Sequence, residues 1–304
     1  MKNYYRLWYL MVVGLFCSLR LSAGTLEALS PQPETVFPIE TTTVTLSWSW
    51  SDTPIENLSG YEIEYAVNGV VQDLVSGLSG TSYVVGGLTP GTRISWRVAA
   101  VDTDAGRTWT AQRQFYVARN QPVYVRTNGS GNGSSWGNAS SLQNALISAV
   151  PGDELWLAAG TYLPVSGYDR NTPFLLLRDG VQIIGGFSGT ETELDQRNWQ
   201  ANPVILSGNI GNAESETDNA RHVLVARGSE EFPLTRATRI DGVIIEKGYA
   251  TEDSVSGGGI RLTRASVDFR NVVFRNNTSY SGGAVAADEH SSPYFFNCIF
   301  NGNK

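Results

Sequence analysis

The sequence predicts an all-β protein with two parts, a β-sandwich followed by a solenoid of stacked coils. The solenoid is indicated by a repeat near the end of the chain, where Gly257–Gly258 returns as Gly282–Gly283, a step of 25 residues (257 to 282). Aromatic and amide residues return after 26 residues (269 to 295), so that Phe269, Asn271, Phe274 and Asn277 correspond to Phe295, Asn297, Phe300 and Asn303. A period of this size with Gly/Asn turns is typical of stacked coils. The sandwich is indicated by about seven short strands in residues 25–119.

Length, charge and composition limit the classes of function. A chain of 304 residues is comfortable for two domains. The 32 glycines and the low charged fraction of 17% suit an extracellular β-protein with many turns. The net charge of −7 argues against a nucleic-acid partner, because phosphate binding needs a basic surface.

The N-terminus has the pattern of a secretory signal peptide, residues 1–23. Lys2 and Arg6 precede an apolar run over residues 7–19, and small residues at 22 and 23 allow cleavage after Ala23. The run is too short to span a bilayer, and an uncleaved anchor is the alternative. We therefore expect a secreted or cell-surface, outer-membrane-associated protein with no membrane span in the mature chain.

Signal removal takes Cys17 with it and leaves Cys298 as the sole cysteine. No intrachain disulfide can then form, so the core and the backbone hydrogen bonds have to hold the fold together. Cys298 has apolar neighbours, which favours a small buried side chain over a nucleophile. His222 and His290 are the two histidines of the chain, which leaves little for a histidine metal site or triad.

Residues 25–119 show the alternation of half-buried strands. Apolar residues alternate with polar ones in two runs, Val44, Leu46, Trp48 and Trp50 in the first and Tyr61, Ile63 and Tyr65 in the second. Asn68–Gly69 is a signal for a tight hairpin. Further strands are expected over residues 83–85, 94–101 and 109–117.

The run Leu88–Val98, followed by Ala100–Val101–Asp102, resembles the E–F turn and F strand of a fibronectin type III domain. Trp48 stands where that family places its strand-B core tryptophan. The resemblance covers residues 25–119 and implies a spacer or binding module. Ile94 replaces the usual tyrosine of the family, so we expect packing alone to fix this corner. Residues 102–106 are interpreted as a solvated turn, with a calcium loop as the alternative.

A second module is expected over residues 122–304, beginning at Gln121–Pro122. A Gly/Ser-rich stretch over residues 128–135 precedes the one convincing helix, which Ser140 or Ser141 can cap and Pro151–Gly152 ends. The apolar stripe of this helix is formed by Leu142, Ala145, Leu146 and Ala149. A short amphipathic helix at this place is suited to cap the open end of a coil core.

Short strands are expected behind the helix over residues 154–158, 160–162, 174–177, 181–184, 204–206, 222–225 and 243–245. Residues 242–245 align with 271–274 at a step of 29 (243 to 272), so residues 251–256 are interpreted as an insertion in one coil. Inward residues are expected to stack on their equivalents, as are asparagines at the turns; these are Ile245, Phe274 and Phe300, and Asn277 and Asn303.

Residues 153–162 look like the first coil of right-handed parallel β-helix proteins of the pectin-lyase-like class. Segments 185–187, 197–199 and 205–211 resemble bacterial surface proteins of that class. The terminal Gly-Gly and Phe/Asn repeats resemble the polymorphic outer-membrane-protein repeat of autotransporter passengers. The resemblance spans most of residues 122–304 and implies a right-handed parallel β-helix; it is specific for fold and weak for activity.

Enzymes of this class need carboxylates that converge on one face beside a basic residue. The sequence lacks the hydrolase patterns (Asn-Thr-Asp, an Asp-Asp pair, Gly-His-Gly, Arg-Ile-Lys) and the lyase stretch Trp-Ile-Asp-His. The nearest titratable cluster, Asp288–Glu289–His290, is interpreted as a solvated turn, and Asp241 beside Gly242 as a turn residue. We therefore predict no catalytic residue and no cofactor.

Two further groups of residues are candidates for binding. Glu214, Glu216 and Asp218 could coordinate calcium in a long loop, although no alternating backbone ligands accompany them, and no metal site is assigned. Trp136 and Tyr168 could stack on sugar rings, and ordinary packing is the alternative.

The sequence favours a secreted or cell-surface, non-catalytic binding or structural protein, adhesin- or stalk-like, whose partner is a polysaccharide or another surface protein. The alternative is a polysaccharide lyase or glycoside hydrolase. Three or more carboxylates within about 5–10 Å on neighbouring coils, beside a basic residue in a groove, would favour the enzyme. The last Phe/Asn coil lacks a cap, so we expect missing sequence or a partner chain to cover it.

Overall fold

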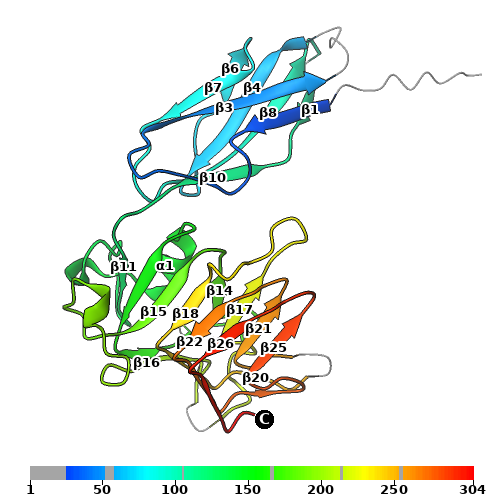
Figure 1. Ribbon diagram of the computed structural model, residues 1–304. Coiled ribbons are helices and arrows are strands. Elements are labelled where there is room, and N and C mark those ends of the chain that lie inside the picture. The colour runs from blue at the N-terminus through cyan, green and yellow to red at the C-terminus, as the bar shows by residue number, and fades with distance from the viewer. Residues whose placement is uncertain (1–24, 52–57, 105, 165–167, 213–214, 253–255) are drawn as a thin grey trace, which may run out of the picture.

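A computed structural model shows a sandwich module joined to a stack of coils (Figure 1). It describes residues 25–304 apart from 52–57, 105, 165–167, 213–214 and 253–255. The predicted signal peptide, residues 1–23, lies outside the described residues. Within the described ranges, no helix is long and apolar enough to cross a membrane.

The first module packs two β-sheets face to face. One sheet has the order β1-β3-β7, formed by Thr25–Ser30, Thr43–Ser51 and Ser82–Gly86. The other has the order β2-β10-β8-β4-β5, formed by Thr35–Phe37, Arg113–Val117, Arg93–Asp102, Leu58–Val67 and Val70–Val71. Two short strands, β6 (Val75–Leu78) and β9 (Arg107–Trp109), pair with β4 and β8. Asn68 and Gly69 both have positive φ, 51° and 85°, and form the predicted hairpin between β4 and β5.

The inward residues of the alternating runs form the sandwich core. Leu46, Trp48 and Ile63 are buried, and the Trp48 ring lies 5.5 Å from the ring of Tyr61. Ile94, which stands in place of the usual tyrosine of the family, is fully buried. Apolar packing therefore occupies this corner of the sandwich. The alternation of period two is therefore sufficient to place the core of this module.

One expected strand of the sandwich is divided in the structure. Residues 109–117 were expected to be extended, but β9 ends at Trp109 and β10 begins at Arg113. Thr110 explains the break, because its N–H donates to Val98 O (2.9 Å) and its hydroxyl accepts from Val98 N–H (3.2 Å). The side chain of Thr110 thus replaces a backbone acceptor, and the ladder ends there.

The second module winds through three parallel sheets. The first has the order β11-β12-β15-β18-β22-β26, formed by Val123–Val125, Glu154–Ala158, Gln182–Phe187, Arg239–Asp241, Asp268–Arg270 and Tyr294–Phe296. The second has the order β13-β16-β19-β23-β27, formed by Gly160–Tyr162, Val204–Ser207, Ile244–Glu246, Val273–Arg275 and Ile299–Asn301. The third has the order β14-β17-β21-β25, formed by Leu175–Leu177, Leu224–Arg227, Ile260–Thr263 and Val285–Asp288. Tyr249–Ala250 (β20) and Thr278–Ser279 (β24) form a short fourth ladder.

The strand register reproduces the repeat seen in the sequence. Phe269 pairs with Phe295 and Phe274 with Phe300, and both ring pairs stack, with centroids 5.1 Å and 4.9 Å apart. Ile245 pairs with Phe274 one coil earlier, at the longer step of 29 residues (245 to 274). Several strands begin or end one or two residues from their expected limits; the strand expected at 222–225, for example, begins at Leu224.

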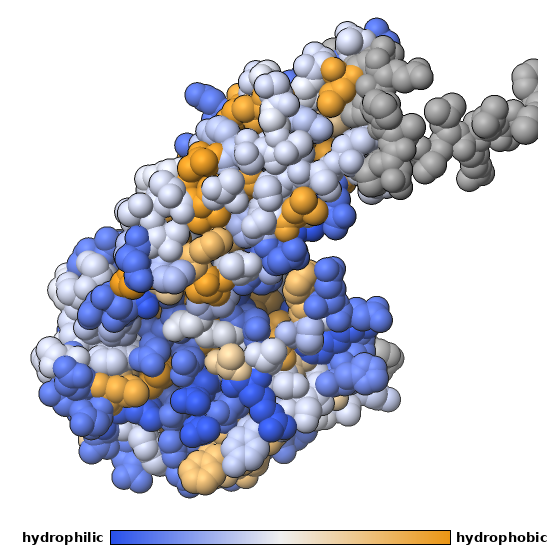
Figure 2. All heavy atoms as spheres, turned by 45° about the horizontal axis from the view of Figure 1, so that its top comes forward, coloured by the Kyte–Doolittle hydropathy of each residue, from blue (hydrophilic) through white to orange (hydrophobic). Residues whose placement is uncertain are grey.

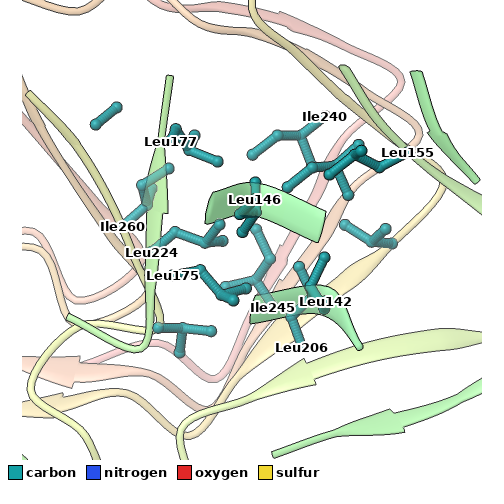
Figure 3. Close-up of a cluster of buried hydrophobic side chains, with 14 of the residues drawn as sticks. Leu142, Leu146, Leu155, Leu175, Leu177, Leu206, Leu224, Ile240, Ile245 and Ile260 are labelled. Carbon is teal, nitrogen blue, oxygen red and sulfur yellow. The ribbon is translucent and has the colours of Figure 1, made fainter. Parts of the chain in front are cut away.

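The helix α1 (Leu142–Ser148) closes one end of the coil core. Ser141 caps it by accepting the N–H of Asn144 (3.2 Å), and Leu142, Ala145 and Leu146 face inward. These side chains belong to the same buried cluster as the coil residues (Figure 3). Ala149 was expected on the helical stripe; it is buried but extended, because the helix ends at Ser148. Two short 3₁₀ helices, η1 (Trp136–Asn138) and η2 (Leu194–Gln196), lie in the loops.

The two modules meet at the end of the solenoid that α1 covers (Figure 1). Arg119, in the connection between β10 and β11, donates to Ser148 O (3.1 Å) and pairs with Asp153 (3.4 Å). Arg93 of the sandwich donates to Ile147 O (3.3 Å). The sandwich therefore contacts the solenoid through arginines that bind the carbonyl groups at the end of α1.

Candidate binding groove

Several carboxylates of the coils are paired with arginines. Asp241 binds Arg197 (2.7 Å), and Glu246 binds Arg275 of the next coil (2.7 Å). Asp268 lies between two arginines, Arg239 (3.3 Å) and Arg270 (3.0 Å), and Glu252 lies between Arg170 (2.6 Å) and Arg221 (3.1 Å). Such pairing links neighbouring coils through charge-assisted hydrogen bonds.

Asp241 differs from its expected role. It was interpreted as a turn residue, but it ends strand β18 and is buried. Its two carboxylate oxygens accept from Arg197 and from the Asn271 amide (2.8 Å). The turn begins only at Gly242, whose φ is 69°, so Asp241 is a strand residue that pairs with Arg197.

The cluster Asp288–Glu289–His290 lies where the sequence placed it, in a turn. Asp288 ends β25, and Glu289 and His290 both have positive φ, 48° and 63°. Glu289 pairs with Arg264, and Asp288 lies 3.9 Å from Arg261. All three side chains are exposed.

His222 and Cys298 are placed for packing. His222 is buried, and its Nδ1 lies 2.8 Å from Gly257 O, so Nδ1 carries the proton and donates it. Burial lowers the pKa of His222, and Arg261, Arg221 and Arg227 lower it further against the opposing effect of the Gly257 hydrogen bond. Burial raises the pKa of the Cys298 thiol, which keeps it protonated.

The carboxylates of the two candidate calcium loops lie in different surroundings. Asp102 Oδ1 accepts the N–H groups of Asp104 (3.0 Å) and Gly106 (2.7 Å), so this carboxylate closes a turn in the way that aspartate commonly does. Glu214 lies outside the described residues, and Glu216 is exposed. Within the described ranges, no three Asp, Glu, His or Cys side chains are grouped as a metal site.

The two candidate sugar-stacking residues are both partly packed. Tyr168 donates to Thr172 O (2.5 Å), its ring lies against Phe174, and burial raises its pKa to about 12. Trp136 donates from Nε1 to Glu191 O (2.8 Å) and packs with Tyr124 (4.8 Å between ring centroids). Trp136 also borders a large hollow, where it can meet a ligand.

This hollow, here called the groove, has a volume of about 620 Å³ and lies outside the first coils. Trp136 borders it, and its charged and polar side chains come from Arg126, Thr127, Asn128, Ser130, Asn138 and Ser188. Arg126 lies over the Trp136 ring (5.7 Å to its centroid) and donates to Gly189 O (2.8 Å). An aromatic ring beside amide and guanidinium donors is suited to hydroxyl-rich ligands.

The loop over residues 128–135 forms one wall of the groove. Gly131 donates to Ala139 O (2.8 Å) and Gly133 to Asn138 O (2.8 Å), which folds the loop onto η1. A Cβ atom at Gly131 would lie 2.1 Å from Asn138 Oδ1, so the close approach requires glycine there. Asn138 also donates to Asn132 Oδ1 (2.8 Å), which fixes its amide.

The other wall is set by Glu191, whose carboxylate organises the loop after β15. Burial alone would raise the pKa of Glu191, but the N–H groups of Ser188, Gly189 and Thr190 donate to it and lower the pKa to about 2. The ionised carboxylate thus holds Ser188 at the groove and Gly189 against Arg126.

A second hollow of about 550 Å³ lies on the other side of the same loop, where the modules meet. Five of its lining side chains are amides, Asn68, Asn120, Gln121, Asn132 and Asn144. Gly131 lines both hollows. On the face shown in Figure 2, hydrophilic residues gather over the solenoid, and hydrophobic residues form small separate patches.

The family comparison agrees with the first part of the fold. Residues 29–116 match the family model of the fibronectin type III domain, so this segment is such a domain. The stacked parallel sheets make the second module a parallel β-helix. A search of curated proteins found no significant match.

Solved structures with similar parts include fibronectin(III)-like modules of Clostridium thermocellum CbhA (13% identity, 34% of this chain and 56% of that chain, TM-score 0.25). They also include a family 28 exopolygalacturonase of Yersinia enterocolitica (13% identity, 92% and 60%, TM-score 0.29) and the pectate lyase PelI of Erwinia chrysanthemi (11% identity, 84% and 70%, TM-score 0.22). The chain thus covers 56% and 60% of the first two structures. At these TM-scores the similarity carries no conclusion about activity.

Proposed function

We propose that this chain is a secreted or cell-surface, non-catalytic protein that binds polysaccharide through the groove beside Trp136. The observation that supports this proposal is the composition of the groove, one aromatic ring with amide, hydroxyl and guanidinium groups around a hollow of about 620 Å³. Sugar rings offer apolar faces that stack on aromatic residues and hydroxyl groups that bind amides and arginine. The β-helix acts as a rigid support for this groove, and the fibronectin type III domain as a spacer or second contact surface.

The pairing of the carboxylates supports a role without catalysis. A glycoside hydrolase needs two carboxyl groups on either side of the scissile bond, about 5–10 Å apart. In the described part of the solenoid four of the five buried carboxylates, Asp153, Asp241, Glu246 and Asp268, bind at least one arginine. The fifth, Glu191, is held by the backbone N–H groups of Ser188, Gly189 and Thr190. The groove itself has no carboxylate in its lining.

Binding to an array of neutral and acidic polysaccharides would test the proposal. We expect Trp136→Ala to weaken binding at least tenfold, equal to about 1.4 kcal/mol, because the ring supplies the stacking surface. Trp109→Ala is the matched control: this tryptophan also lies under an arginine (Arg97, 4.4 Å), but it belongs to the sandwich. Equal binding by both variants would exclude the groove as the site.

Incubation of the same polysaccharides with the purified protein tests the absence of catalysis. We expect no new reducing ends and no unsaturated products. Cleavage that disappears in an Asp268→Asn variant would instead support the lyase or hydrolase alternative. The mass of the secreted protein tests the export signal, because cleavage is expected after Ala23.

A further inference from the structure

The loop between β16 and β17 contains buried oxygen atoms without partners. These atoms are Asn209 Oδ1, Asp218 Oδ1 and Asn219 Oδ1, each with less than 1 Å² of accessible area. Asn219 as a whole is 1% exposed. An acceptor buried without a partner costs about 1–3 kcal/mol, so three in one loop call for a ligand that satisfies them.

Other unpartnered buried carboxylate oxygens in the described part of the solenoid have a simple explanation. Asp153 Oδ1 and Glu252 Oε2 belong to carboxylates whose other oxygen pairs with an arginine. The side chains of Asn209, Asp218 and Asn219 have no arginine or lysine partner among the described ion pairs and hydrogen bonds. Arg170 approaches only the backbone oxygen of Asn219 (3.1 Å), and its charge is balanced by Glu252 (2.6 Å).

Hydrogen bonds connect the described parts of this loop near the three residues. Ala220 N–H donates to Gly208 O (2.8 Å), so the residues next to Asn209 and Asn219 in the chain are hydrogen-bonded to each other. Asp218 Oδ2 accepts the N–H of Asn212 (2.9 Å), which turns the carboxylate toward the start of the same loop. The base of the loop is fixed to the next coil, because Gly208 N–H donates to Glu246 O (2.9 Å).

We propose that this loop binds a calcium ion through Asn209, Asp218 and Asn219. Ca²⁺ takes six to eight oxygen ligands from carboxylate, amide, backbone and water, and it accepts irregular geometry. Two amide oxygens and one carboxylate oxygen fit that preference. Mg²⁺ is a poorer fit, because it needs near-octahedral geometry and gives up water reluctantly. A single carboxylate gives weak affinity, on the order of 10⁻⁴–10⁻³ M, which is typical of extracellular calcium modules.

The site is separate from the groove, so its failure would leave the polysaccharide proposal unaffected. The proposed ligands differ from the calcium candidates weighed in the sequence, where no metal site was assigned. Asp218 was a calcium candidate together with Glu214 and Glu216, but Asn209 and Asn219 supply the other unpartnered oxygens. Glu216 is exposed, and its backbone oxygen accepts the N–H of Asn219 (3.1 Å).

Calcium titration of the chelator-treated mature chain tests the proposal, by calorimetry and by the thermal midpoint in Ca²⁺ and in Mg²⁺. We expect saturable Ca²⁺ binding with Kd on the order of 10⁻⁴–10⁻³ M and a higher midpoint in Ca²⁺ than in Mg²⁺. Asp218→Asn keeps an oxygen for the Asn212 N–H and is expected to weaken Ca²⁺ binding at least tenfold. Asp195→Asn, on the exposed helix η2, is the matched control and is expected to bind like the parent.

A variant that is expected to bind Ca²⁺ more tightly separates a loss of binding from a failure to fold. Asn209→Asp adds a second carboxylate to the half-buried position and is expected to tighten Ca²⁺ binding at least threefold. No binding by the parent at about ten times the expected Kd would overturn the proposal, and ordered water would then satisfy the three oxygens. An equal response to Mg²⁺, or one unchanged in Asp218→Asn, would show an adventitious ion only and would overturn it too.

Discussion

Asparagine side chains at the turns carry hydrogen bonds from coil to coil. Asn277 is fully buried, and its amide donates to Ile245 O (3.0 Å) and to Asn303 Oδ1 (2.9 Å). Its Oδ1 accepts the N–H of Gly248 (3.0 Å). The short strands leave these backbone groups unpaired at the turn, and the asparagine replaces the missing ladder.

Loss of the Asn277 amide is therefore expected to be costly. Asn277→Ala should lower the free energy of unfolding by about 2–4 kcal/mol, because a buried carbonyl and a buried N–H are left unpaired at about 1–3 kcal/mol each. Denaturant unfolding followed by circular dichroism measures the change. Asn301→Ala, at an exposed position of β27, is the control and should stay within about 0.5 kcal/mol of the parent. Similar losses in both variants would contradict the role assigned to Asn277.

Single residues show how far the sequence predicts this molecule. The stacking of Asn277 on Asn303 follows from the repeat, because equal residues at equal steps occupy equal places in a coil. The groove does not follow in that way. Arg126, Asn138 and Ser188 are distant in sequence and meet only through the coil stacking and the folding of a glycine-rich loop. The sequence offered Trp136 as a candidate for sugar stacking, but it did not show that Trp136 would pack against Tyr124.

At the scale of elements, α1 closes the coil core with one face. Leu146 is 4% exposed and packs in the same cluster as the coil leucines, whereas Ile147 on the same helix is 61% exposed. The helix is only seven residues long. Isolated helices of that length are unstable in water, so burial of this face has to hold α1 in place.

Matched truncations on the two faces of α1 test this dependence. Leu146→Ala should lower the free energy of unfolding by about 2–5 kcal/mol, because it removes buried methyl groups and leaves a cavity. Ile147→Ala should cost less than about 0.5 kcal/mol, since the side chain is exposed. Chemical denaturation monitored by tryptophan fluorescence compares them. An equal effect of both changes would mean that α1 does not seal the core.

The sequence predicted best the helix and the strands in which apolar residues recur at a regular spacing. The stripe of Leu142, Ala145 and Leu146 predicted α1, and the alternation in residues 44–50 predicted β3. Short strands with both faces buried have no alternation, so their limits shifted by one or two residues. Thr110 broke an expected strand through a side-chain hydrogen bond, which no periodicity reveals.

At the scale of the whole molecule, a buried carboxylate joins the two modules. Asp153 is 3% exposed and pairs with Arg119 (3.4 Å), which also reaches the end of α1. Burial raises the pKa of Asp153, and Arg119 and the Val150 N–H oppose that rise. Nothing in either module's sequence predicts this contact, because it depends on how the finished modules meet.

Removal of Arg119 is expected to destabilise the molecule in a pH-dependent manner. A carboxyl with a raised pKa binds more protons in the folded chain than in the unfolded one, so stability falls as pH rises from its ordinary value of 3.8 to the folded value. Arg119→Ala should raise the pKa of Asp153 further, so the pH range over which stability falls extends to higher pH. The free energy of unfolding should drop by about 1–3 kcal/mol at neutral pH and by less near pH 4.

A second substitution, Asp153→Asn, forms a double-mutant cycle with Arg119→Ala. It separates the effect of the buried charge from the loss of the contacts that Arg119 makes. Asp153→Asn keeps an oxygen for the Val150 N–H (2.9 Å) and has no charge to bury. In the Arg119→Ala background it should therefore recover part of the stability at neutral pH and none near pH 4. Urea unfolding of the four proteins at both pH values measures the coupling between Arg119 and Asp153. A loss in Arg119→Ala that is the same at both pH values would show that Arg119 joins the modules through its carbonyl contacts alone.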